Sequence, residues 1–134
     1  MSWRIGALLA GATFAATTCV ATAHHSIAMF DQGHPIELIG TVQEYRFSSP
    51  HAFIFLEVKG ADSHPVIWRL EGNSPNSLTW EGWSSKTLKP GDEVRVTVEP
   101  LRSGAPGGTW TPKKATFKDG TPIAGPHGMN FRQP

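Results

Sequence analysis

The sequence predicts an all-β protein, a small five-stranded OB-like barrel with one short helix between its third and fourth strands. Short apolar runs alternate with polar residues and are separated by Gly- and Pro-rich turns. One run changes the parity of its apolar residues next to a glycine, which is typical of a bulged strand. Closure into a barrel removes the exposed edges that five short strands would present. A small open β-sandwich with one helix is the alternative.

The first strand is expected over residues 35–47 and the second over residues 51–58. The apolar residues of the first strand occupy alternate positions and then slip by one, so this strand should be bent or bulged. The second strand is apolar on both faces, so one face should be core and the other covered or ligand-facing. The large residues of the first strand are Ile36, Leu38, Val42, Tyr45 and Phe47.

A helix is expected to begin at Pro75 and to end at Glu81 or Gly82. Asn73 or Ser74 would be its N-cap, and proline suits the first helical position because its missing N–H has no partner there. The core anchors expected in this region are Leu78 and one of two tryptophans, Trp80 or Trp83.

The remaining strands are expected over residues 66–71, 93–99 and 110–118. The second of these has the clearest alternation, because valine occupies every other position and charged or polar residues the positions between. Large aromatic side chains are expected in the core or plugging the barrel. They are Trp68, Trp80, Trp83 and Trp110.

The first 23 residues have the pattern of a secretory signal peptide. A short basic start ends at Arg4, an apolar run follows without an acidic residue, and Ala21 and Ala23 provide the small residues that signal peptidase reads. A membrane anchor is the alternative, but the apolar run is only about 17 residues long and lacks a basic stop. We therefore expect a periplasmic or secreted protein without stable membrane insertion.

Cleavage after Ala23 would leave residues 24–118 as one OB-like domain and residues 119–134 as a Gly/Pro-rich tail. Cys19 would leave with the signal, so disulfides and thiolate metal sites are excluded from the mature chain. The whole chain has 12 Lys and Arg against 11 Asp and Glu, and loss of Arg4 would balance them. This balance argues against a nucleic-acid partner. No nucleophile or phosphate-loop motif is present, so no catalytic residue is assigned.

Three histidines are the candidate metal ligands: His24, His25 and His51. Cleavage after Ala23 would make His24 the first residue, whose amino group and ring can chelate one ion. Such nitrogen donors suit copper(II), while three histidines and a water would suit zinc as the second choice. Cleavage after Ala21 would instead place a histidine third and create a different amino-terminal copper chelate.

Two carboxylates, Asp31 and Glu71, are candidates either to bind the metal themselves or to orient these imidazoles. The alternative for the three histidines is a structural role, with a solvated N-terminal pair and a third ring bonded to a turn backbone. The remaining histidines each adjoin Pro or Gly in loops or the tail and are expected in solvent. They are His34, His64 and His127.

A second hypothesis is a module that binds no metal. OB-type barrels commonly bind oligonucleotides or sugars on one face. A small ligand, an oligosaccharide or a protein partner would suit an aromatic face here, although the same side chains can simply be packed over. The candidate residues of this face are Tyr45, Phe47, Phe53 and Phe55.

Short motifs over nearly the whole mature chain carry a family resemblance. They lie at residues 24–31, 40–42, 49–51, 68–72, 74–76, 82–83 and 88–92. Together they resemble DUF6152, a family of small exported bacterial proteins of unknown function. The chain departs from the family pattern at Ile27, where an aromatic is usual, and at Ser49, where Asn is usual. The resemblance implies an exported barrel and no particular reaction.

Overall fold

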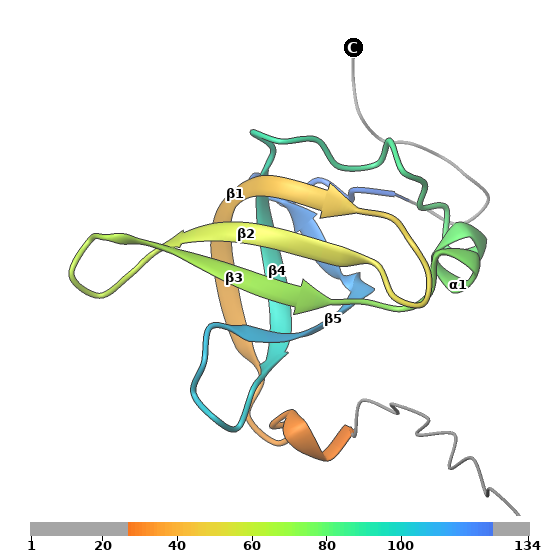
Figure 1. The fold of residues 1–134 in the computed structure, drawn as a ribbon. Helices are drawn as coiled ribbons and strands as arrows, with labels where there is room; N and C mark the ends of the chain where they lie inside the picture. Colours follow the sequence, from red (N-terminus) through yellow and green to blue (C-terminus); the bar gives the residue numbers. More distant parts are fainter. Residues whose placement is uncertain (1–26, 125–134) are drawn as a thin grey trace, which may run out of the picture.

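The computed structural model of the chain describes residues 27–124, which form a closed five-stranded barrel (Figure 1). The order around the barrel is β1-β2-β3-β5-β4, and β4 pairs back to β1. The β3–β5 pair is parallel, and the other pairs are antiparallel. The elements are η1 (Ile27–Met29), β1 (Ile36–Arg46), β2 (Phe53–Lys59), β3 (Pro65–Glu71), α1 (Pro75–Trp80), β4 (Glu93–Pro100) and β5 (Gly107–Phe117).

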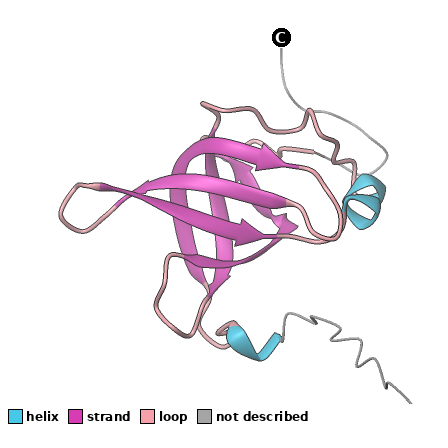
Figure 2. Ribbon diagram, viewed as in Figure 1, coloured by secondary structure: helices cyan, strands magenta, loops and turns pink. Residues whose placement is uncertain are grey.

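This architecture confirms the predicted fold, including the single short α-helix between the third and fourth strands of the described chain. Figure 2 shows α1 at the end of the barrel where β3 ends, and η1 beside the β4–β5 loop. No helix within residues 27–124 is long and apolar enough to cross a membrane. The predicted signal peptide and the last ten residues of the tail lie outside the described residues.

The predicted bulge in β1 lies between Val42 and Glu44, where the register against β2 shifts. Val42 pairs with Leu56, and Tyr45 pairs with Ile54. Because directly paired residues of an antiparallel ladder point to the same side, the bulge turns Tyr45 toward the barrel interior.

The core fills the barrel with the alternate residues of its strands. Val94, Val96 and Val98 are buried as the β4 pattern predicts. Ile123 is also fully buried, although it belongs to the segment predicted as a tail, so the packing of the domain extends beyond residue 118. The other fully buried large aliphatic side chains are Val42, Ile54, Leu56, Leu70 and Leu78.

The helix α1 begins as its sequence predicts. Ser74 is the N-cap, and its hydroxyl accepts a hydrogen bond from the Ser77 amide at 3.3 Å, with Pro75 at the first helical position. Leu78 is buried on the side of the helix that faces the barrel.

The two helix-end tryptophans have opposite environments. Trp80 is 82% exposed, so its predicted place in the core is wrong, whereas Trp83 is 2% exposed. Trp80 follows Leu78 by two positions, which on an α-helix is about 200° of rotation and therefore the opposite face. After the helix, Gly82 adopts a φ of 84°, a conformation that glycine favours, and the chain returns Trp83 to the core.

The strand β5 begins earlier than its composition suggests. The sequence predicts this strand only from residue 110, but Gly107 and Gly108 pair with Arg69 and Leu70 and close the barrel. A β-carbon on Gly108 would lie 2.6 Å from the carbonyl oxygen of Glu99, so the close approach of two backbones requires glycine here.

Candidate functional site

A pocket of about 420 Å³ lies between the N-terminal segment and strands β3, β4 and β5. Glu71, Thr109 and Glu99 are neighbours across β3, β5 and β4, and all three line it. Ile27 and Phe30 line it from the N-terminal side. Its lining also includes Gln32, His51, Gly72 and Trp110.

His51 is held by a backbone carbonyl just before β2 begins. Its Nδ1 atom lies 3.2 Å from the carbonyl oxygen of Gly72, and its Nε2 atom lies 3.7 Å from Oε1 of Glu71. A carbonyl can only accept, so Nδ1 carries the proton in this bond, and a neutral ring then has its lone pair on Nε2. His51 thus makes the bond to a turn backbone that a structural role predicts. In this position its Nε2 atom is directed toward the Glu71 carboxylate.

Glu71 is the carboxylate that the structure brings to a predicted metal ligand. Its side chain is only 13% exposed, and its backbone oxygen accepts a hydrogen bond from the Thr109 hydroxyl at 3.0 Å. These contacts fix the end of β3 beside His51. Of the two predicted carboxylates, Glu71 is the one that lies beside His51.

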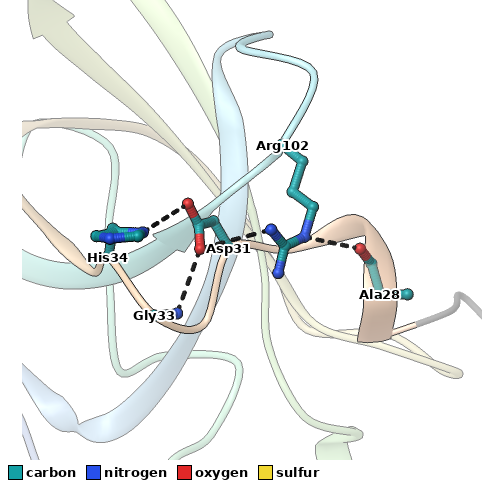
Figure 3. Close-up of polar contacts among 5 residues, drawn as sticks. All are labelled: Ala28, Asp31, Gly33, His34 and Arg102. Carbon is teal, nitrogen blue, oxygen red and sulfur yellow. Dashed lines mark hydrogen bonds and ion pairs between the residues drawn. The ribbon is translucent and has the colours of Figure 1, made fainter.

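Asp31, the other predicted carboxylate partner, contacts Gly33, His34 and Arg102 within the described residues (Figure 3). Its Oδ2 lies 3.1 Å from Nδ1 of His34, and its Oδ1 accepts a hydrogen bond from the Gly33 amide at 3.3 Å. Oδ1 also lies 3.8 Å from a guanidinium nitrogen of Arg102. Asp31 therefore orders the segment that leads into the pocket.

The N-terminal segment is attached to the β4–β5 loop by several bonds. Arg102 Nε donates to the carbonyl of Ala28 at 3.1 Å, and the Arg102 amide donates to the carbonyl of Met29 at 2.9 Å (Figure 3 shows the first of these). The Asp31 amide donates to the carbonyl of Pro100 at 2.8 Å. Phe30 is 8% exposed, so an apolar anchor accompanies the polar ones. These contacts fix the position of Ile27 at the pocket.

The Asp31 contacts predict a pH dependence. The hydrogen bond from His34, followed by its charge, the Gly33 amide and Arg102, holds the pKa of Asp31 below its ordinary value of 3.8. A carboxyl whose pKa is lower in the folded state stabilises the fold above its unfolded-state pKa, and this contribution is lost as the pH falls through the folded-state pKa.

We therefore expect Asp31→Asn to lower the free energy of unfolding at pH 6 and to lower it less at pH 2. Urea unfolding at both pH values measures this difference. An equal loss at both values would show that the charge of Asp31 is not the cause.

The other described histidines lie in solvent, as predicted. The side chain of His34 is 85% exposed and that of His64 is 81% exposed, with its ring 3.0 Å from Asp62. Within residues 27–124, no group of three or more His, Cys, Asp or Glu side chains could hold a metal ion. His24, His25 and His127 lie outside the described residues.

The four predicted face aromatics do not form one surface. Tyr45 and Phe47 pack against the core, and the Tyr45 ring lies 6.2 Å from that of Trp83. The Tyr45 hydroxyl is buried, which raises the pKa of this side chain. Phe53 and Phe55 lie on the outer side of the sheet because their partners across the ladder are Arg46 and Glu44.

The two outer phenylalanines are themselves covered by cationic groups. The Arg69 guanidinium lies 4.3 Å from the centre of the Phe53 ring, and that of Arg46 lies 5.0 Å from the Phe55 ring. Cation–π contacts of this kind stabilise the sheet surface without a ligand. The observed arrangement therefore gives a smaller apolar face than the sequence predicted.

Sequence reasoning missed the β4 and β5 side of the pocket. Thr97 and Glu99 occupy the outward positions of β4, and the alternation of valines identifies these positions as outward. The pattern does not show that Thr109 of β5 and Glu71 of β3 lie beside these residues of β4. That arrangement depends on closure of the barrel.

Comparisons with known proteins identify a family. No curated protein matches the chain. A family model described as "Family of unknown function (DUF6152)" matches residues 12–111. The match includes His51, Glu71 and most of the barrel. Because it spans well over half of the sequence, the chain belongs to the DUF6152 family.

Proposed function

We propose that this is an exported protein that binds a transition-metal ion, copper before zinc, at the pocket between the barrel and its N-terminal segment. The proposed ligands are His24, His25 and His51. One observation carries the proposal: Ile27, which follows His25 by two residues, lines the same pocket as His51 and Glu71. A predicted site that spans two distant parts of the sequence is thus supported by where those parts meet.

Chain length is compatible with this assembly. An extended chain covers about 3.3–3.6 Å per residue, so the backbone of His25 is at most roughly 7 Å from that of Ile27, and that of His24 at most roughly 11 Å. Ile27 itself lines the pocket of about 420 Å³, so the length of the chain is compatible with both imidazoles binding there.

The polarity of the His51 neighbourhood also favours a cation. With Nδ1 bonded to the Gly72 carbonyl, the Nε2 lone pair and the Glu71 carboxylate are both electron donors, 3.7 Å apart. A positive ion near both is stabilised by each, and a backbone carbonyl bonded to the other ring nitrogen, as Gly72 is to Nδ1, is a common support for a liganding imidazole. Copper is preferred over zinc because the N-terminal amine adds a further nitrogen donor.

The direct test begins with mass spectrometry of the secreted protein, which identifies its first residue. Titration of that protein with Cu(II) should then end at one equivalent, and the electron paramagnetic resonance spectrum should show hyperfine coupling to several nitrogens. A copper spectrum without nitrogen coupling contradicts the proposed ligands.

An N-terminal extension provides a matched variant. Placing three glycines before His24 keeps every imidazole but moves the amino group away from the ring and leaves no histidine in the first three positions, which destroys the amine–imidazole chelate. We expect the Cu(II) affinity to fall by roughly tenfold or more, since each factor of ten is only about 1.4 kcal/mol. Competition with a chromophoric chelator measures the Cu(II) affinity. An unchanged affinity would show that the terminal amine is not a ligand.

A further inference from the structure

Another pocket, of about 380 Å³, lies between the end of α1 and β5. Trp80 and Glu81 line it from the helix end, Pro112 and Lys113 line it from β5, and Ala124 lines it as the last described residue. Trp80 is 82% exposed, although tryptophan is highly buried on average in native proteins. The pocket therefore has an aromatic wall that the described chain leaves open.

The chain that follows β5 turns back and runs along this strand toward the pocket. The Phe117 amide donates a hydrogen bond to the carbonyl of Thr121 at 2.8 Å, and Pro122 forms an antiparallel bridge with Thr116. Ile123, the next residue, is fully buried in the core, which fixes the direction in which the chain continues. The rest of the sequence therefore starts at the wall of the pocket.

The register of this returning segment suits the prolines of the sequence. The pairing of β5 with β3 ends at Thr109, so β3 does not cover the rest of this edge. Thr116 and Pro122 face each other without a mutual hydrogen bond, because the bond lies between their neighbours, and such pairs alternate with bonded ones in an antiparallel ladder. Continuing the same register along β5 places Pro126 opposite Pro112 in a pair of the same kind, where a missing N–H costs no hydrogen bond.

We propose that residues 125–128 continue along β5 and occupy this pocket, with the ring of Pro126 packed on the indole of Trp80. Pro126 follows Ala124 by two residues, so its backbone lies within roughly 7 Å of a residue that already lines the pocket. Proline suits an aromatic-lined groove, because its fixed φ leaves little conformational freedom to lose on packing. The partner of the exposed indole is thus a nearby segment of the same chain.

Nuclear magnetic resonance of the metal-free secreted protein tests this contact, and the result does not depend on the proposed metal site. The wild type should show nuclear Overhauser effects between the ring protons of Pro126 and the indole protons of Trp80. Pro126→Ala should shift the indole ¹H–¹⁵N resonance of Trp80. Pro134→Ala, which removes a proline outside the proposed segment, is the matched control and should leave that resonance in place.

Trp80→Ala tests the same contact from the other side. The variant should fold, because Leu78 and Trp83 fill the core at this end of the barrel. The backbone order parameter of the His127 amide should lie above about 0.6 in the wild type and should fall below about 0.6 in the variant, since the segment would lose its aromatic contact.

Three results would each overturn the inference. Absence of the Pro126–Trp80 effects in the wild type, or an unchanged His127 order parameter in Trp80→Ala, shows that the segment does not pack in this pocket. Effects that join Trp80 to Phe131 in place of Pro126 contradict the proposed register. A Trp80 resonance that moves with protein concentration, and not in Pro126→Ala, assigns the pocket to a contact between two copies of the chain.

Discussion

Replacing His51 by alanine should lower the Cu(II) affinity of the mature protein by at least about a hundredfold. His51 is the described ligand of the proposed site, and it joins the barrel to the N-terminal segment through the pocket that both line. Loss of a supporting partner alone commonly costs 10–100-fold in metal affinity, so loss of a ligand should reach or exceed the upper end of that range. Competition against a chromophoric copper chelator measures the change.

His64→Ala is the control for this experiment. His64 lies in the β2–β3 turn, its side chain is 81% exposed, and its ring contacts Asp62. Its removal should leave copper affinity unchanged. Because His51 also bonds the Gly72 carbonyl, urea unfolding of metal-free His51→Ala must first show a folded protein. A folded variant with wild-type affinity would refute the proposed role of His51.

Replacing Trp83 by alanine should lower the free energy of unfolding by about 3–5 kcal/mol, the usual cost of removing a large buried aromatic. Trp83 is 2% exposed, and its ring lies 4.9 Å from that of Trp110 and 6.2 Å from that of Tyr45. Domains of this size are stable by only about 5–15 kcal/mol, so the variant should lose a large part of its stability. Urea unfolding monitored by circular dichroism measures it.

Trp80→Ala gives the matched comparison three positions away. Trp80 is 82% exposed, so its truncation should change the free energy of unfolding by less than about 0.5 kcal/mol. A larger loss in Trp80→Ala than in Trp83→Ala would contradict the packing of this end of the barrel.

Local patterns were sufficient for the elements whose two faces differ. In β4, the alternation of Val94, Val96 and Val98 with polar residues identified both the strand and its buried face. The Ser74–Pro75 pair located the start of α1, because capping and proline chemistry act within one turn. These features depend on neighbours in sequence, and a sequence contains them in full.

Patterns failed where a side chain's environment depends on a distant strand. The change of register in β1 was visible in the sequence. The pairing of β1 with β2 then decides that Tyr45 turns inward beside Trp83 and that Phe53 stays outside. Burial of Ile123 likewise depends on the end of the chain returning to the barrel, and Gly/Pro content alone suggested a tail.

The candidate site was likewise predictable only where it depends on the chemistry of single residues. Residue chemistry alone singled out His51 and Glu71, and the structure brings them together. The same reasoning assigned Asp31 to an imidazole of the site, whereas the structure pairs it with His34 and Arg102. Arg102 is far from Asp31 in sequence, and the two meet because the N-terminal segment packs on the β4–β5 loop. The sequence alone therefore did not indicate this contact.

The join between β3 and β5 is short and parallel, and parallel pairing is slightly less stable per residue than antiparallel pairing. Its residue pairs in the described chain are Arg69–Gly107, Leu70–Gly108 and Glu71–Thr109. His51 and Glu71 lie on the β2–β3 side of this join, while Arg102 ties the N-terminal segment to the other side. A metal ion bound by both that segment and His51 would connect the two sides of the β3–β5 pairing. Local opening of the barrel at this pairing would have to release the ion. Metal binding should therefore also raise the free energy of that local opening.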